Sequence, residues 1–509
     1  MSGQANNPSA RDWLAPFMAV AVIGAMAWVT RRYFMDDAFI GFHYLTNLLS
    51  GRGFTFNPGE RVEGITNIGW VLSLIPLASI LTIPAAAKIM GLFLASATVI
   101  IAYALARALG RDGGAIAAAP VPLLIACNFD YAYLSLAGME TALLSALLLA
   151  AAWLTMIDRR RWLVGLLLAL AFLCHPESAL IFPLFIVLVA ALRRQELRGW
   201  LPSFGLFAGA VALFTLARYS YFHDLLPQTF YAKPAGIKDV IKSGLIFMKG
   251  WDTNFIAPWG GIFVIMFALA GGITAYRSAP RAALFLAAAA MAGAAFAVYA
   301  PQDWTFLGRY FAPYLPAAVI LSWKGVIETH EAALSRIMDK RRIGWLLAAY
   351  AVAISASGLA DAAMHLRKSY VERYPGYVLT SARLEGPALW IRDYVPDGAV
   401  IATRRIGAVA FYSRKKIFDW KFGLIDREVA AVVRRTPGAI NFPTHPALAE
   451  LWAERSPDFL LEDSHVIAVV LRETGGSEDR FEVHGVPYHV IRKFPIGLDV
   501  DWVLCQKME

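Results

Sequence analysis

Two adjacent carboxylates, Asp36 and Asp37, closely follow the first long apolar run of the chain. Two acids in such a place must stay hydrated or be paired, because an isolated charge is costly near a membrane. One of them can act as a general base that accepts a proton from an attacking hydroxyl group, while its neighbour fixes its position or a metal ion. The other interpretation is a helix cap or a hydrated interfacial acid, and composition alone leaves both open.

Further polar side chains lie in this first segment and in later short segments between apolar runs. A lipid-facing helical bundle does not favour them. Each one alone is also consistent with a helix cap or an interfacial anchor. A shared cavity on one side of a membrane would satisfy all of them. The candidates for substrate binding are His43, Glu63, Asn67, Glu140, His175, Glu177, His223, Gln228, Tyr231, Asp303 and Tyr310.

Two cationic residues are candidates for holding a phosphate group. Lys233 and Arg309 each lie in a polar segment after an apolar run, and cationic donors balance the charge of a phosphate where water is scarce. The alternative for Lys233 is a snorkelling side chain among interfacial tyrosines such as Tyr219, Tyr221 and Tyr231.

The composition indicates that membrane helices position these residues. The chain has 509 residues, of which 58% are hydrophobic and only 17% charged, and its mean hydropathy is +0.52. A soluble domain usually carries about a quarter charged residues. Crossing the hydrocarbon takes about 20 apolar residues, with about 17 as the lower limit. Uncharged runs of that length are Trp13–Thr30, Ile89–Ala106, Thr141–Ile157, Gly199–Ala217, Thr253–Tyr276, Ala282–Gln302 and Ile343–Ala360. Shorter borderline runs are Ala115–Phe129, Trp162–Cys174, Ser178–Leu192 and Tyr310–Trp323.

The basic residues predict the orientation of these runs. They gather in short loops, including 107–111, 159–161, 193–198, 277–281 and 340–342, and basic loops remain on the cytoplasmic side. All of them face that side if Gly64–Pro84 lies in the interface or dips in and returns, which gives about 11 spans. If Gly64–Pro84 crosses instead, the later basic loops fall outside. We favour the first solution, in which residues 31–84 form an external loop.

The net charge of +9 is explained by this topology rather than by nucleic-acid binding. Three cysteines, Cys127, Cys174 and Cys505, provide neither a disulfide framework nor metal-ligand spacing. No metal site is expected from the residue pattern, although a divalent cation beside the two aspartates is possible chemistry.

The chain changes composition near Asp361, which predicts a membrane domain over residues 1–360 and an external α/β domain over residues 361–509. Pro387–Tyr394 and Ala447–Arg455 are typical of amphipathic helices. Short apolar or β-branched runs between turn-forming residues predict strands. These runs are Ala399–Thr403, Ala408–Tyr412, Phe459–Leu461, Val466–Leu471 and Tyr488–Ile491.

Several motifs resemble those of the GT-C glycosyltransferase superfamily. Within it, they are most similar to bacterial arabinofuranosyltransferases related to the mycobacterial terminal arabinan-capping enzyme and the pilin arabinosyltransferases. The first motif is specific as a unit and the others are individually modest. They are DDAFIGFHYLTNLLSGRGFTFNPGERVEGITNIGW (36–70), SLAGMETALL (135–144), CHPES (174–178), RYSYFHDLLPQTFYAK (218–233), DWTFLGRYFAPYLP (303–316) and GAVAFYSRKKIFDWKFGLID (407–426).

The resemblance implies a polytopic α-helical membrane protein with a small C-terminal periplasmic α/β domain, located in a bacterial inner membrane. It implies a polyprenyl-phosphate-linked sugar donor, arabinofuranose as the sugar, and a glycan or glycoprotein acceptor on the periplasmic side. An aspartate of the first external loop is catalytic in the superfamily, which corresponds to Asp36 or Asp37 here. At CHPES, relatives more often have arginine where this chain has His175.

Two other classes of function remain open. A transporter or flippase for lipid-linked sugars would be expected to show paired repeats or charges at mid-bilayer, and the sequence shows neither. A non-catalytic membrane scaffold whose tail binds glycan is the other possibility.

Overall fold

The structure is a computed structural model, and its residues group into two compact units. It describes residues 10–110, 117–232, 238, 240–241, 244–245, 260–300, 308–370, 380–436, 440–477, 479–495 and 500–508. Unit 1 consists of Met1–Arg31, Ala85–Ala212 and Ala235–His365. Unit 2 consists of Arg32–Pro84, Leu213–Pro234 and Leu366–Glu509.

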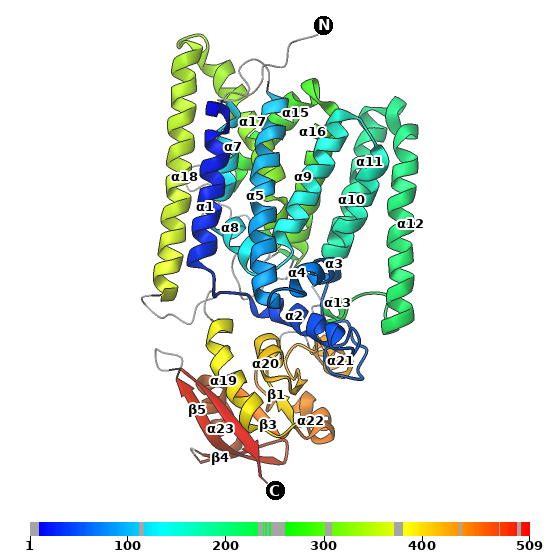
Figure 1. Ribbon diagram of the computed structural model, residues 1–509, viewed down its shortest axis with the longest axis vertical. Coiled ribbons are helices and arrows are strands. Elements are labelled where there is room, and N and C mark those ends of the chain that lie inside the picture. Colours follow the sequence, from blue (N-terminus) through cyan, green and yellow to red (C-terminus); the bar gives the residue numbers. More distant parts are fainter. Residues whose placement is uncertain are drawn as a thin grey trace. The chain divides into compact units, whose positions relative to one another are not determined.

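Unit 1 is helical. Figure 1 shows α9 beside α10 and α15 beside α17. Its helices are α1 (Leu14–Val29), α5 (Ile83–Leu109), α7 (Pro120–Ala126), α8 (Phe129–Leu136), α9 (Thr141–Ile157), α10 (Arg161–Cys174), η2 (Pro176–Leu180), α11 (Ile181–Leu192), α12 (Leu197–Phe222), α15 (Gly260–Ser278), α16 (Pro280–Tyr299), α17 (Leu315–Leu334) and α18 (Lys340–Tyr370). The C-terminal residues of α12 and α18 belong to unit 2.

Several of these helices have the length and apolarity of membrane spans. Within the described residues, four pass a length and hydropathy test: Ile83–Leu109, Arg194–Phe222, Pro280–Tyr299 and Arg341–Arg367. A fifth span would combine α8 and α9, which are bent by 110° at a short break. Shorter apolar helices are Leu14–Val29, Arg161–Cys174, Pro176–Leu192 and Val264–Ser278. The total of about 11 spans stays a prediction.

Glycines permit the tightest helix crossing in unit 1. A Cβ atom on Gly271 of α15 would lie 1.9 Å from the carbonyl oxygen of Leu321, and one on Gly325 of α17 would lie 1.9 Å from that of Phe267. Small residues let the backbones of membrane helices approach closely, so dispersion contacts can form along both helices. A side chain at either glycine would force α15 and α17 apart.

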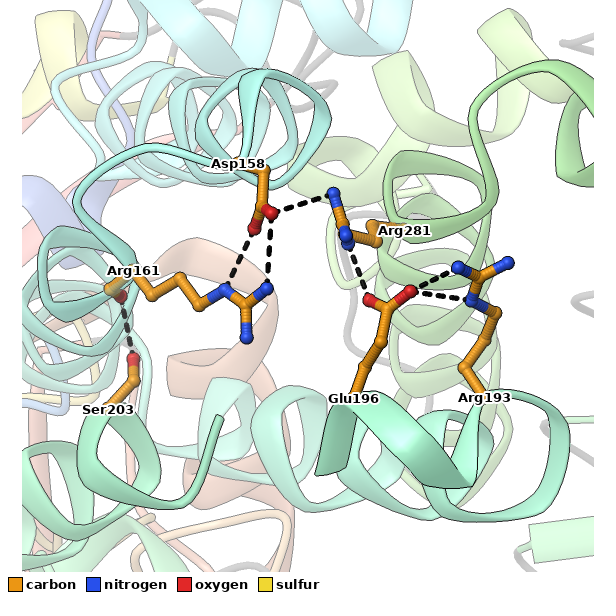
Figure 2. Close-up of polar contacts among 6 residues, drawn as sticks. All are labelled: Asp158, Arg161, Arg193, Glu196, Ser203 and Arg281. Carbon is orange, nitrogen blue, oxygen red and sulfur yellow. Dashed lines mark hydrogen bonds and ion pairs between the residues drawn. The ribbon is translucent and has the colours of Figure 1, made fainter. Parts of the chain in front are cut away.

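A network of ion pairs joins three of the basic loops at one end of this helical bundle (Figure 2). Asp158 lies 2.8 Å from Arg161 and 2.9 Å from Arg281. Glu196 lies 2.5 Å from Arg281 and also pairs with Arg193. The loops after α9, after α11 and before α16 therefore meet at the same end of unit 1, as the charge pattern predicts.

Unit 2 contains the acidic segment and the C-terminal sheet. Its first part forms α2 (Asp36–Leu49), α3 (Ile68–Ser73) and α4 (Ile75–Ala78), and residues 228–232 form α13 (Gln228–Ala232). At about 1.5 Å per residue, α3 and α4 are too short to cross a membrane. This agrees with the solution in which Gly64–Pro84 does not span.

The C-terminal part of unit 2 folds around a six-stranded mixed sheet of order β2-β1-β3-β6-β5-β4. The strands are β1 (Val400–Ala402), β2 (Lys416–Phe418), β3 (Phe459–Asp463), β4 (Arg480–Val483), β5 (Val486–Pro495) and β6 (Asp501–Lys507). Strand β1 pairs in parallel with β2 and β3, and the remaining pairs are antiparallel. The helices are α19 (Thr380–Tyr394), α20 (Ile406–Ser413), α21 (Arg427–Arg435), α22 (Ala449–Arg455) and α23 (Ser464–Thr474).

A hydrophobic core lies between the sheet and these helices. Trp420, Trp452, Leu460, Val470 and Tyr488 are completely shielded from solvent within it. Burying a large side chain of this kind contributes about 1.5–3 kcal/mol relative to leaving it exposed. The predicted C-terminal sheet domain is therefore confirmed.

Two of the predicted strands are wrong. Ala408–Tyr412 lies in α20 and Val466–Leu471 lies in α23. Both runs are apolar because they are buried, and period alone does not separate a short buried helix from a short buried strand. The predicted strands at 399–403, 459–461 and 488–491 and the helices at 387–394 and 447–455 are confirmed.

Candidate functional site

The side chain of Asp36 lies at the start of α2 and is buried, with 6% of its surface exposed. Its Oδ1 accepts a hydrogen bond from the backbone N–H of Ala408 at 2.9 Å, and its Oδ2 accepts one from Gly407 at 3.2 Å. Burial raises the pKa of Asp36, while the two N–H groups and the nearby Arg405 guanidinium oppose that rise. The carboxyl group is therefore held by main-chain donors from the far end of the chain.

Asp37 is in a different environment from its neighbour. The structure describes all of residues 33–47, and in that stretch every residue except Asp37 is buried. Successive side chains on an α-helix diverge by about 100° because a turn takes 3.6 residues. A molecule outside this unit can reach Asp37 more readily than Asp36.

His43 and Asn47 lie one turn apart on the same helix. The Asn47 amide donates to the carbonyl oxygens of Thr55 and Phe56 at 2.9 and 2.7 Å, which fixes the loop after α2. His43 packs against the Phe56 ring at 4.7 Å. Burial lowers the pKa of His43 to about 3, so the imidazole is neutral near pH 7. It can orient a neighbour or a ligand, but it provides no charge.

Glu63 forms a buried ion pair with a residue of α12. Its Oε2 lies 2.7 Å from Nε of Arg218, and the two side chains are 1% and 3% exposed. Its carbonyl oxygen accepts from the backbone N–H of Gln228 at 2.9 Å. Burial raises the pKa of Glu63 to about 7 against the opposing effect of Arg218. Glu63, in the predicted external loop 31–84, thus contacts the end of α12 and the start of α13.

The other candidates of unit 2 lie on neighbouring segments. Asn67 is buried at the start of α3 and Gln228 is buried at the start of α13. His223 is exposed and has a left-handed backbone. The Arg434 guanidinium lies 5.6 Å from the Tyr231 ring centre, so Tyr231 also contacts the C-terminal part of the unit.

A second group of candidates lies in unit 1. His175 Nδ1 is 2.6 Å from Oε2 of Glu177, and its Nε2 is 3.9 Å from Oε1 of Glu140. These three side chains are at most 13% exposed. The extended backbone of His175 ends α10, and the following Pro176 begins η2, which turns Glu177 back toward the imidazole. The acids and the imidazole can share a proton or bind polar groups of a ligand together.

Aromatic contacts connect this group to Arg309 and Tyr310. The His175 ring lies 5.3 Å from Phe296, which in turn lies 5.2 Å from Tyr310. The Arg309 guanidinium is 5.6 Å from the Tyr310 ring centre. The preceding Gly308 donates its backbone N–H to Asp130 at 2.9 Å. Five predicted site residues of unit 1 (Glu140, His175, Glu177, Arg309 and Tyr310) therefore form one neighbourhood.

This neighbourhood and the arginine network occupy opposite ends of the same helices. Glu140 precedes α9 and Asp158 follows it, while Arg161 begins α10 and His175 follows it. Seventeen residues of α-helix span about 26 Å, close to the hydrocarbon thickness of about 30 Å. The basic loops and the acid–histidine group are thus separated by about one membrane thickness.

Comparison with solved structures identifies the fold. ArnT from Cupriavidus metallidurans, solved with undecaprenyl phosphate, is similar over 98% of both chains, with a TM-score of 0.56 and 14% identity. AglB from Archaeoglobus fulgidus, solved with an inhibitory peptide and a dolichol-phosphate, is similar over 91% of this chain and 70% of that one, with a TM-score of 0.54 and 11% identity. Both are GT-C glycosyltransferases. This chain has the GT-C fold.

Sequence relatives cover smaller parts of this chain. A terminal β-(1→2)-arabinofuranosyltransferase of Mycobacterium tuberculosis is 40% identical over 58 residues, which are 11% of this chain and 9% of that protein. A family model described as a domain of unknown function (DUF8728) matches residues 369–504, the region of the C-terminal sheet. The GT-C fold confirms the predicted polytopic helical architecture with a C-terminal sheet domain.

The GT-C structure also shows polar residues that the sequence patterns did not single out. The Lys88 ammonium group on α5 donates to the carbonyl oxygens of Thr30 and Leu136 at 2.9 and 2.5 Å. A lysine that follows three alanines in an apolar helix is the signal that could have drawn attention to it. Asp130 was also missed, and it is the acid that holds residue 308 beside Arg309.

Two predicted site residues, Lys233 and Asp303, lie outside the described residues. Among the residues that the structure does describe, no group of three or more His, Cys, Asp and Glu side chains is arranged to hold a metal ion. A divalent cation stays an untested possibility.

Proposed function

We propose that this chain is a membrane glycosyltransferase that moves a sugar from a polyprenyl-phosphate donor to a glycan or protein acceptor. The observation that carries the proposal is the acidic start of α2, where buried Asp36 and accessible Asp37 lie side by side in a chain with the GT-C fold. A carboxylate reachable from outside the protein is what deprotonation of an acceptor hydroxyl requires.

The reaction transfers the anomeric carbon of the sugar from a phosphate oxygen to the acceptor oxygen. A carboxylate of the Asp36–Asp37 pair takes the hydroxyl proton as the new carbon–oxygen bond forms. The bond from the anomeric carbon to the phosphate oxygen breaks, and the polyprenyl phosphate leaves with that electron pair. We assign to Lys233 and Arg309 the role of stabilising the negative charge of this phosphate, since cations stabilise a leaving phosphate. A single displacement would invert the anomeric centre.

The donor class is supported by the solved relatives, which contain undecaprenyl phosphate in ArnT and a dolichol-phosphate in AglB. Arabinofuranose as the sugar is supported by the short match to the mycobacterial arabinofuranosyltransferase. The peptide bound to AglB is consistent with a protein acceptor, which we propose beside a glycan acceptor.

We further propose a bacterial inner membrane as the location, with α2 and the C-terminal sheet domain facing the periplasm. The arginine network supports this orientation, because it gathers three basic loops at one end of the bundle, and basic loops stay in the cytoplasm (Figure 2).

The test is transfer by purified protein in lipid nanodiscs. Synthetic polyprenyl-phosphate donors carrying arabinofuranose or a hexose would be supplied with glycan and peptide acceptors, and the double variant Asp36→Asn/Asp37→Asn would be the inactive control. We expect glycosylated acceptor and free polyprenyl phosphate in equal amounts with the wild type. Donor movement across vesicles without glycosylation would instead identify a flippase, and acceptor binding without turnover a scaffold.

A further inference from the structure

The carboxylate of Asp36 occupies the start of α20, eight residues of helix in the C-terminal sheet domain. Its two oxygens accept from two successive backbone N–H groups, Gly407 and Ala408. The fit leaves no room for a side chain at position 407, because a Cβ atom there would lie 2.0 Å from the carbonyl oxygen of Asp36. Gly407 is thus required for the close approach of α2 to α20.

The start of α20 lies next to the point where the strand order of the sheet reverses. Strand β1 lies between β2 and β3. The chain leaves β1 through α20 to β2, and later forms β3 on the other side of β1. In open α/β sheets such a reversal of strand order opens a crevice at the carboxyl ends of the strands, where ligands bind beside the helix N-terminus. Here the protein's own Asp36 carboxylate is the anion at that place.

The rest of α2 and its loop continue the same attachment. Phe39 of α2 packs against Phe411 and Tyr412 of α20, each at 5.3 Å between ring centres. The Asn57 side chain donates to the carbonyl oxygen of Ile417 at 2.9 Å and accepts from its N–H at 3.1 Å. Ile417 lies in the edge strand β2, so Asn57 satisfies backbone groups that the sheet leaves unpaired.

We infer that Asp36 is a positioning residue, an internal ligand that holds the acidic end of α2 on the sheet domain, and that Asp37 is the base. The inference rests on the proposed transfer reaction. To act as a base, Asp36 would have to meet the acceptor hydroxyl at an oxygen that is buried and already accepts a backbone N–H. Asp37 is partly exposed and is turned about 100° away around the helix.

The experiment combines kinetics with amide hydrogen exchange on the full-length protein in nanodiscs, using Asp36→Asn, Asp36→Ala and Asp37→Asn. An asparagine oxygen can still accept from α20, whereas alanine cannot. We expect Asp37→Asn to lower kcat at least about a hundredfold with unchanged exchange at residues 406–410. Asp36→Asn should stay within about fivefold of the wild-type kcat. Its kcat/KM should still fall toward acidic pH, as expected for a reaction that uses a carboxylate base. Asp36→Ala should speed exchange at 407 and 408 and lower kcat at least about tenfold.

Asp426 provides a matched control in the same unit. Its carboxylate also accepts from two backbone N–H groups, those of Glu428 and Val429 at the start of α21. Asp426→Ala should speed exchange in α21 while exchange in α20 and the transfer rate stay as in the wild type.

Three outcomes would overturn the inference. A hundredfold loss in Asp36→Asn with protected α20 amides would make Asp36 the base. Unchanged exchange at 407 and 408 in Asp36→Ala would remove the attachment. A wild-type protein that transfers no sugar would refute the proposed function and with it the role of Asp37, while the exchange data would still decide whether Asp36 holds α20.

Discussion

The arginine network of unit 1 and the Glu63–Arg218 pair of unit 2 use the same chemistry in different surroundings. In the network, Asp158, Arg161 and Arg281 are 25–31% exposed and Glu196 is 11% exposed (Figure 2). Glu63 and Arg218 are 1% and 3% exposed. Exposed ion pairs contribute about 0–1 kcal/mol each, whereas a buried pair must offset the loss of hydration of both charges.

The difference separates two uses of charge in one chain. Partly exposed arginines on three loops are sufficient to fix membrane orientation. A buried pair is a poor way to gain stability, because well-packed apolar residues do as well. We therefore interpret Glu63–Arg218 as part of the functional region around α2, and the network as a feature of topology.

The largest effect is expected when the buried pair loses its cation. At pH 8, Arg218→Ala should lower the free energy of unfolding by about 3–5 kcal/mol, because the buried Glu63 carboxyl group then lacks its cation and must either stay unpaired or bind a proton. Thermal unfolding in nanodiscs would measure this. The control is Arg427→Ala, which removes a pair with Asp224 whose arginine is 42% exposed. Equal losses in the two variants would contradict the distinction drawn from burial.

The next effect is a pH dependence that belongs to Glu63. Because burial raises its pKa from 4.5 to about 7, the folded state favours the protonated form. The stability that this pKa difference contributes is complete below pH 4.5 and is lost as the pH rises to about 7. One pKa unit corresponds to about 1.4 kcal/mol, so the fall is about 3 kcal/mol. Glu63→Gln should flatten this part of the profile, and an unaltered profile in that variant would assign the dependence to another group.

His175 is an intermediate case, since it and its partners are at most 13% exposed. His175→Ala removes the 2.6 Å partner of Glu177 and should cost about 1–3 kcal/mol of stability. It should also lower kcat/KM for transfer at least about tenfold, a loss of about 1.4 kcal/mol in transition-state binding. Glu177→Gln keeps an acceptor for the imidazole and should be milder. Full transfer activity in His175→Ala would remove this group from the site.

The smallest effect is expected in the network. Asp158 has a left-handed backbone, with φ of 49°, which asparagine tolerates. Asp158→Asn should therefore change the unfolding free energy by less than about 1 kcal/mol, and the difference should shrink further at high salt. A loss as large as that of Arg218→Ala would mean that the network supports the fold.

The sequence predicts most of the elements and part of the site. The apolar helices follow from the long uncharged runs. Of the two wrongly predicted strands, only the one at Val466–Leu471 has a helix signal in the nearby sequence. Asp463 caps α23 by accepting from the N–H of Val466 at 3.0 Å, and an aspartate three residues before an apolar run is a readable helix signal.

The start of α20 has no such local signal. Its cap is Asp36, 371 residues away from Gly407, so no window along the sequence contains both partners. The same is true of Asn57 and Ile417, which are 360 residues apart. Spacing predicts chemistry where partners are close in the chain, as at Glu177 and His175, and cannot do so where a cap comes from a distant segment.

Sugar transfer by Asp37→Asn, measured on both products, decides whether this carboxylate is the base. Wild-type protein and Asp37→Asn would each be given a radiolabelled polyprenyl-phosphate sugar in nanodiscs, and label entering the acceptor would be followed together with polyprenyl phosphate released. The account predicts matched release and incorporation by the wild type and at least about a hundredfold less of both by the folded variant. Equal rates in the two proteins would contradict it.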